Sequence, residues 1–235
     1  MPRYSEFDGS SGKRVQMRWR SALLVTVWVL AVGLTTGTGA TATADPPPLD
    51  SVVLTAHQAG PGYVRYTMNG GRQVKGKVTL DFCGGGYPSE ALRLRRFQTI
   101  YANQAGGAQL SNEVVRYSPG GARQALREVA RRVRTCPRTP VQSPVPENGV
   151  ERYLSVALIH DPGLLAGSVA IKMTIEVAED GRNVQREVIA IYQRHGNFLS
   201  GVYAYGGTAG TRLASALHAA HASADNLLLS DRLTA

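Results

Sequence analysis

An apolar segment near the N-terminus constrains this chain most, because it decides the compartment in which the rest must fold. Residues 22–34 form an apolar run interrupted only by Thr26 and Gly33. Four basic residues precede the run: Lys13, Arg14, Arg18 and Arg20. Small residues then lead to Ala42-Thr43-Ala44, just before a proline-rich stretch. A basic leader, an apolar core and a small-x-small site in this order are typical of an export signal.

We expect residues 1–44 to be a cleaved signal peptide, because the apolar run is shorter than the roughly 20 residues of a comfortable membrane span. The weakly polar residues 35–43 could lengthen the segment, so an uncleaved signal anchor formed by residues 21–44 is the alternative. The basic flank sends the C-terminal part outward in both cases. We therefore expect residues 45–235 to form a single extracytoplasmic domain, either secreted or held at the membrane.

The charge of the chain suggests an anionic partner. The formal net charge is +9, and arginines cluster between residues 93 and 138. A basic surface suits an anionic glycan or a lipid headgroup of the cell envelope. It can also serve solubility alone. Nucleic acid is not expected as a partner, because an exported protein rarely meets it.

Two cysteines, Cys83 and Cys136, follow the export signal. Outside the cytoplasm an even number of cysteines predicts a disulfide bond. A zinc site or a thiol nucleophile is the alternative, but the spacing is not that of metal ligands and no C-x-x-C motif occurs. The bond would join the end of a predicted strand to the end of a predicted helix.

Alternation of apolar and polar residues predicts a set of strands. It is clearest at 168–178, where Val169, Ile171 and Met173 share one face and Lys172 lies on the other. This pattern is typical of a half-buried antiparallel strand. Further strands are predicted at 63–68, 77–82, 92–102, 113–117, 153–159, 184–193 and 198–205.

Two amphipathic helices complete the pattern. The first follows Ser118-Pro119, where proline suits the first helical position, and ends before Pro137. The second follows residues 206–210 and carries an apolar stripe along one side. The fold class is therefore α+β, with an antiparallel meander sheet, helices packed on one face and one disulfide.

Two stretches, LDFCGGGYPSEALRLRRFQTIYAN and SNEVVRYSPGGARQALREVARRVRTCP, resemble a known family. They are similar to the PknH-like extracellular sensor domain of actinobacterial serine/threonine kinases and to the stand-alone exported proteins that share it. The resemblance covers roughly residues 49–229. It implies an antiparallel sheet with helices around a cleft that binds an unidentified ligand. The kinase domains have two disulfides, whereas this chain can form only one.

Catalytic motifs are not found in the sequence. The V-A-I-K at 169–172 stands without the glycine-rich loop and the H-R-D of a kinase, and neither G-x-S-x-G nor H-E-x-x-H occurs. His218 and His221 have metal-ligand spacing but no third ligand in view. We therefore expect no enzyme, no metal and no cofactor. A catalytic site assembled from scattered residues, such as Glu90 and Glu113, is not excluded by sequence.

The sequence favours an exported, non-catalytic domain that senses or binds a small-molecule or envelope ligand. A cell-envelope hydrolase and an envelope lipid carrier are the alternatives. The ligand is expected in a cleft lined by 87–96 and 192–205, where arginine can pair with an anion and tyrosine can cover its apolar part. The candidate ligand-binding residues are Tyr87, Glu90, Arg93, Arg96, Tyr192, Arg194, Tyr203 and Tyr205.

Two further features allow both a functional and a purely structural explanation. Glycines 84–86 could cradle an anion with their backbone N–H groups, or could let the chain turn beside the disulfide. Four arginines recur on the predicted helix opposite its apolar stripe: Arg123, Arg127, Arg131 and Arg134. They could grip an anionic envelope component, or form an ordinary solvated helix face.

Overall fold

The computed structural model describes residues 48–103, 105, 107–145, 148–179 and 181–230. The predicted export signal lies outside these residues. Among these residues, none of the helices combines the length and the hydropathy of a membrane-spanning segment.

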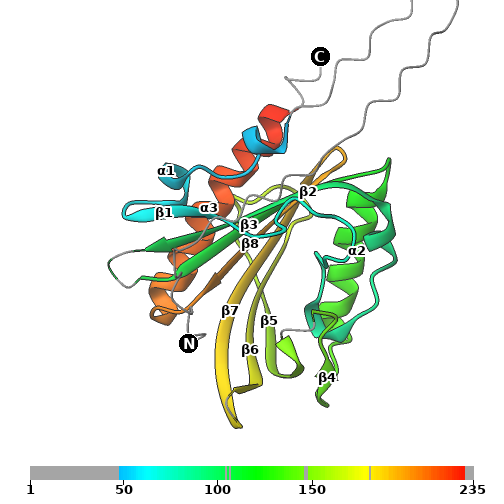
Figure 1. Cartoon of the computed structure of the whole chain (residues 1–235), viewed down its shortest axis with the longest axis vertical. Coiled ribbons are helices and arrows are strands. Elements are labelled where there is room, and N and C mark those ends of the chain that lie inside the picture. Colours follow the sequence, from blue (N-terminus) through cyan, green and yellow to red (C-terminus); the bar gives the residue numbers. More distant parts are fainter. Residues whose placement is uncertain (1–47, 104, 106, 146–147, 180, 231–235) are drawn as a thin grey trace, which may run out of the picture. The chain divides into compact units, whose positions relative to one another are not determined.

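An antiparallel sheet forms the centre of the domain (Figure 1). The described residues contribute eight strands to it in the order β1-β2-β3-β8-β7-β6-β5-β4. Their bounds are β1 Tyr63–Thr67, β2 Arg93–Asn103, β3 Gln109–Tyr117, β4 Val141–Gln142, β5 Val150–Ile159, β6 Val169–Glu179, β7 Arg182–His195 and β8 Phe198–Tyr205. Strands β5 to β8 form the predicted meander, and β8 pairs with β3 to join it to the first three strands.

Two long helices and several short helical turns accompany the sheet. Their bounds are η1 Leu49–Ser51, α1 Ala56–Ala59, η2 Phe82–Gly84, η3 Pro88–Leu92, α2 Gly121–Arg134 and α3 Ala209–Ser230. A disulfide joins Cys83 to Cys136, with 5.3 Å between their Cα atoms. The predicted α+β class, the antiparallel meander and the single disulfide are therefore confirmed.

The prediction that the helices share one face of the sheet is wrong for the two long helices. In β7, Ala190 and Tyr192 pack in the cluster that contains α2 residues, whereas Ile189 and Ile191 pack in the cluster that contains α3 residues. Successive side chains of a strand point to opposite faces. The helices α2 and α3 therefore cover opposite faces, and Figure 1 shows them on either side of the strands. The central strands are apolar on both faces for this reason.

The strand predicted at 77–82 is not formed. Its backbone groups are bound by side chains instead: Glu90 accepts hydrogen bonds from the N–H groups of Thr79 and Leu80, and Arg93 donates one to the carbonyl oxygen of Lys77. Buried backbone groups need partners, but the partners need not belong to a strand. The apolar residues of this segment, such as Leu80, are still buried as the alternation required.

The glycines beside the disulfide are explained by packing and backbone geometry. Cys83 itself has a φ of 56° and Gly84 a φ of 59°, so the chain turns through the left-handed region at the bond. A Cβ on Gly84 would lie 2.7 Å from Cβ of Val141, and one on Gly85 would overlap the guanidinium of Arg132. These contacts support the structural explanation for Gly84 and Gly85, since glycine leaves room for the packing against Val141 and Arg132.

Candidate functional site

Three of the predicted tyrosines come together on the α2 side of the sheet. Tyr87 and Tyr192 are buried in the core cluster that contains α2, and the half-buried Tyr203 packs against it. The rings of Tyr192 and Tyr203 meet edge to face, with their centroids 5.7 Å apart. The hydroxyl of Tyr87 donates a hydrogen bond of 2.7 Å to the carbonyl oxygen of Phe82. These rings are thus part of the core packing.

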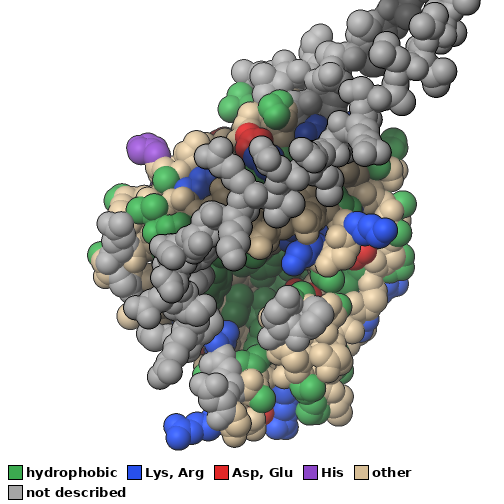
Figure 2. Space-filling view, viewed as in Figure 1, with side chains coloured by type: hydrophobic (Ala, Val, Ile, Leu, Met, Phe, Trp, Pro, Cys, Tyr) green, Lys and Arg blue, Asp and Glu red, His purple; other side chains and the backbone are tan. Residues whose placement is uncertain are grey.

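A hollow is visible on the face of the domain shown in Figure 2. Hydrophobic side chains form its floor, and Lys or Arg side chains lie near its edge.

Arg93 and Glu90 form an internal ion pair, with 3.1 Å between Nη2 and Oε2. Arg93 also donates hydrogen bonds to the carbonyl oxygen of Lys77 at 2.7 Å and to the hydroxyl of Thr79 at 3.0 Å. Burial raises the pKa of Glu90, while hydrogen bonds from the backbone and the charge of Arg93 act against that rise. Both side chains hold the segment between β1 and η2 in place.

Arg96 and Glu113 form a second pair that is almost fully buried, with side-chain exposures of 5% and 3%. The guanidinium of Arg96 also donates to the carbonyl oxygens of Gly70 and Gly71, both at 3.3 Å. Burial raises the pKa of Glu113, and the charge of Arg96 lowers it. Arg93 and Arg96 of β2 are therefore both engaged with protein oxygen atoms.

Thr79 connects the two ion pairs. Its N–H donates to Glu90 at 3.0 Å, and its hydroxyl donates to Glu113 at 2.7 Å. The two carboxylates that could have formed an acid–base pair thus meet at one threonine, and each already has an arginine partner. Such networks stabilise a loop when every member is satisfied.

The last two predicted residues lie apart from this network. Arg194 is half-buried near the end of β7, and the described part of the chain offers it no ion pair. Tyr205 is half-buried at the end of β8, opposite Gln109 and Val188 in the sheet. The structure thus gathers Tyr87, Tyr192 and Tyr203 in one cluster but leaves these two outside it.

Asp81 is an unusual carboxyl group that the sequence did not single out. Burial raises its pKa to about 7, and the nearby negative charge of Glu151 adds to the rise. Glu113 and Glu90 raise the pKa further, and its own backbone N–H opposes the change. No cation pairs with Asp81 among the described residues. Only its position beside Phe82-Cys83 could have drawn attention to it.

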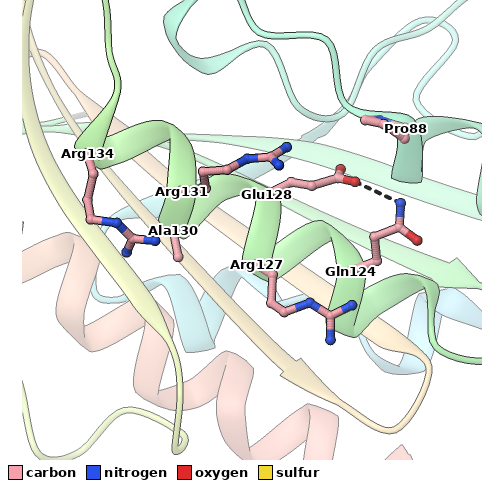
Figure 3. Close-up of a pocket in the computed structure, with 7 residues that line it drawn as sticks. All are labelled: Pro88, Gln124, Arg127, Glu128, Ala130, Arg131 and Arg134. Carbon is pink, nitrogen blue, oxygen red and sulfur yellow. Dashed lines mark hydrogen bonds between the residues drawn. The ribbon is translucent and has the colours of Figure 1, made fainter.

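A groove of about 590 Å³ runs along the outer side of α2 (Figure 3). Its lining residues are Pro88, Gln124, Arg127, Glu128, Ala130, Arg131 and Arg134. None of the predicted ligand-binding residues lines it, although Pro88 belongs to the predicted segment 87–96. Figure 3 shows Arg127, Arg131 and Arg134 extending from the helix. Three of the four arginines that the sequence placed opposite the apolar stripe therefore line the groove.

The geometry of α2 explains why these arginines gather. At 3.6 residues per turn, Arg123, Arg127, Arg131 and Arg134 fall within an arc of about 80°. The apolar residues Ala122, Leu126 and Val129 are buried against the sheet on the other side. All four arginines are exposed, and within the described residues none of their side chains forms an ion pair or a hydrogen bond.

The arginine row costs stability in the free helix. Like charges four residues apart destabilise a helix by about 0.2–0.5 kcal/mol per pair, and two such pairs occur from Arg123 to Arg131. Cations near the helix C-terminus gain from the helix dipole, which helps Arg131 and Arg134 in the last turn but not Arg123 in the first. An anionic partner would remove the repulsion.

Glu128 is the only acidic residue of α2, and it is turned inward. It accepts hydrogen bonds from the hydroxyl and the N–H of Ser89, at 2.6 and 3.2 Å, and from the side-chain amide of Gln124 at 2.8 Å. The last of these bonds is drawn in Figure 3. Glu128 therefore fastens η3 to α2 and leaves the exposed arginines without a carboxylate partner.

A second groove, of about 330 Å³, lies between α1, β1 and α3 and includes Tyr63, Asn103 and His218. The neighbouring His221 is 2.9 Å from a carboxylate oxygen of Asp161. Among the described residues no group of three or more His, Cys, Asp or Glu side chains is arranged to hold a metal ion.

No protein-family model and no curated protein matches this chain. Among solved structures, it is similar to the extracellular domain of PknH from Mycobacterium tuberculosis. The identity is 13% and the TM-score 0.48, over 77% of this chain and 98% of that one. It is also similar to an uncharacterized protein from Mycobacterium smegmatis, with 14% identity and a TM-score of 0.35, over 77% of this chain and 100% of that one.

The PknH domain is of the kind that the sequence resembles. Both TM-scores lie below 0.5, so neither likeness carries an argument about function.

Proposed function

We propose that this chain is an exported, non-catalytic domain that binds an anionic component of the cell envelope. The observation that carries the proposal is the groove along α2, where Arg127, Arg131 and Arg134 are exposed and unpaired within the described residues. Guanidinium groups bind carboxylate and phosphate oxygens through paired N–H donors. Exposed cations without a protein partner are therefore available to such a ligand.

The arrangement of the buried carboxylates supports binding over catalysis. Glu90 and Glu113 are held by Arg93 and Arg96 and by backbone or hydroxyl donors. A general acid or base needs access to a substrate proton, which these tied groups do not have. The disulfide supports an extracytoplasmic location, because such bonds persist in oxidising compartments.

Titration with soluble polyanions tests the proposal. Inositol hexakisphosphate and a heparin oligosaccharide would be added to isotope-labelled exported protein, and backbone amide shifts would be followed by NMR. We expect the largest changes on α2 and η3. Replacing Arg127, Arg131 and Arg134 together with Gln should abolish them.

A matched variant controls for loss of charge. Lys75, Arg95 and Arg182 are exposed and outside the groove, and their joint replacement by Gln removes the same three charges. This variant should bind as the wild type does. Equal weakening in both variants, or shifts centred away from α2, would contradict the proposal. Turnover of an ester, glycan or peptide substrate would instead favour the hydrolase alternative.

A further inference from the structure

The chemistry of the α2 groove narrows the class of its anionic partner; this step rests on the function proposed above. Every exposed cation of α2 is arginine: Arg123, Arg127, Arg131 and Arg134. The planar guanidinium matches the geometry of phosphate oxygens better than a lysine ammonium does. The row therefore suits phosphate groups.

The lining of the groove does not suit a sugar ring. Its residues include arginine, glutamine, proline and alanine side chains and the inward-turned Glu128, but no aromatic ring. Aromatic side chains supply large apolar faces and are the usual covering for flat ligands in binding sites. The tyrosines of this face lie in the core, in the cluster of Tyr87, Tyr192 and Tyr203. A glycan chain would find cations here and little to stack on.

The row is extended and outward-facing. Arg123 and Arg134 are separated by about 16 Å along the helix axis, from a rise of 1.5 Å per residue. All four arginines lie on the exposed side of α2, within an arc of about 80°. A straight row of cations on the outer side of a helix can reach several phosphates at once when these are spread over a flat surface. A single small anion could contact only part of it.

We infer that the exposed face of α2 docks on an anionic phospholipid surface and contacts the phosphates of several headgroups. Charge complementarity selects this partner, and the arginine spacing selects a surface over a small ion. The described domain begins at Pro48, four residues after the predicted cleavage site. Were the preceding segment retained as an anchor, it would keep the domain near such a surface; were it cleaved, α2 would supply the contact alone.

Vesicle co-sedimentation tests the inference on the protein as exported. Binding to phosphatidylcholine vesicles with and without phosphatidylglycerol would be compared at low and at physiological ionic strength. Any contribution of residues 21–44 is shared by both vesicle types and all variants. Each basic residue near an anionic membrane contributes about fivefold to binding. Replacing Arg127, Arg131 and Arg134 with Gln should therefore weaken binding to anionic vesicles on the order of 100-fold.

The control variant, with Lys75, Arg95 and Arg182 replaced by Gln, should retain most of the binding. Added salt should weaken wild-type binding, because exposed charges are screened. Equal binding to neutral vesicles, or equal losses in the two variants, would overturn the inference. Binding of inositol hexakisphosphate at α2 without binding to anionic vesicles would overturn it too, while leaving the proposed function intact. Loss of both would refute both.

Discussion

Replacing Asp81 with Asn should stabilise the domain at neutral and alkaline pH. Asp81 is half-buried near Glu151, Glu113 and Glu90, and burial together with these charges raises its pKa from 3.8 to about 7. The native state therefore retains a proton that the unfolded chain releases between these two pH values. Asparagine has a similar shape and carries no charge, so the variant avoids the burial of an unpaired anion.

The sign follows from proton linkage. Between pH 3.8 and about 7 the native state binds more protons than the unfolded state at this position, so wild-type stability falls as pH rises through this window. Above pH 7 the loss is complete, and below pH 3.8 it is absent. The advantage of the Asp81→Asn variant should therefore grow from acid to neutral pH and then level off.

The size of the effect follows from the shift. At 1.36 kcal/mol per pKa unit, a rise from 3.8 to about 7 corresponds to roughly 4 kcal/mol. Asp81 keeps partial solvent exposure, which weakens the effect of burial. We therefore expect a gain of about 2 kcal/mol in the free energy of unfolding at pH 8, or roughly 4–8 °C in Tm for a domain of this size.

Urea denaturation followed by circular dichroism at pH 4, 6 and 8 measures the effect. Both tryptophans precede residue 45, so fluorescence is a poor probe of the domain. Asp225→Asn, on the exposed side of α3, controls for the change in net charge. An unchanged free energy of unfolding at pH 8, or an equal gain at pH 4 and pH 8, would refute the reasoning.

Three other predictions can be tested directly. Glu113→Gln leaves the buried Arg96 without its counter-ion and should lower the free energy of unfolding by roughly 3–5 kcal/mol, measured by thermal unfolding. Asp50→Asn breaks an exposed ion pair and should lower it by less than about 1 kcal/mol. Equal losses in the two variants would contradict the burial of the Arg96–Glu113 pair. Cys83 and Cys136 should resist thiol labelling in denatured, unreduced protein, and two reactive thiols per chain would exclude the bond. Replacing both with Ser should lower the free energy of unfolding by roughly 4 kcal/mol, because the unfolded chain is then no longer restrained by the closed loop. N-terminal sequencing of exported protein should begin at Asp45, while recovery of only full-length chain in membranes would indicate an anchor.

Local pattern and chemistry in the sequence were sufficient for most of the repeating elements, although the strand predicted at 77–82 does not form. The alternation at Val169, Ile171 and Met173 placed those side chains on one buried face, and β6 forms there. The apolar stripe of α2 likewise predicted its buried side, although the helix begins at Gly121, two residues after the expected Pro119. The disulfide followed from compartment and parity. The strand, the buried side of the helix and the disulfide depend on the spacing of residues or on single residue types. Both can be read directly from the sequence.

Tertiary structure decided which polar side chains remain available to a ligand. The sequence predicts Arg93 and Arg96 in a ligand cleft. The segment between β1 and η2 instead folds over them and supplies carbonyl oxygens from residues far away in the chain. The four arginines Arg123, Arg127, Arg131 and Arg134 of α2 have no such cover and stay exposed. A covered arginine and an exposed arginine carry the same charge and look the same in the sequence. Only the path of the segment between β1 and η2 shows which arginines are covered.

Tertiary structure also decided the faces of the sheet and the state of Asp81. The run Val188-Ile189-Ala190-Ile191-Tyr192 is apolar without alternation, which indicates burial on both faces, but only the packing shows that α2 covers one face and α3 the other. Asp81 acquires its raised pKa because distant segments bury it, and the charges of three acidic residues from separate elements add to the rise. Spacing along the chain determines periodic structure, whereas charge and burial depend on which distant segments meet.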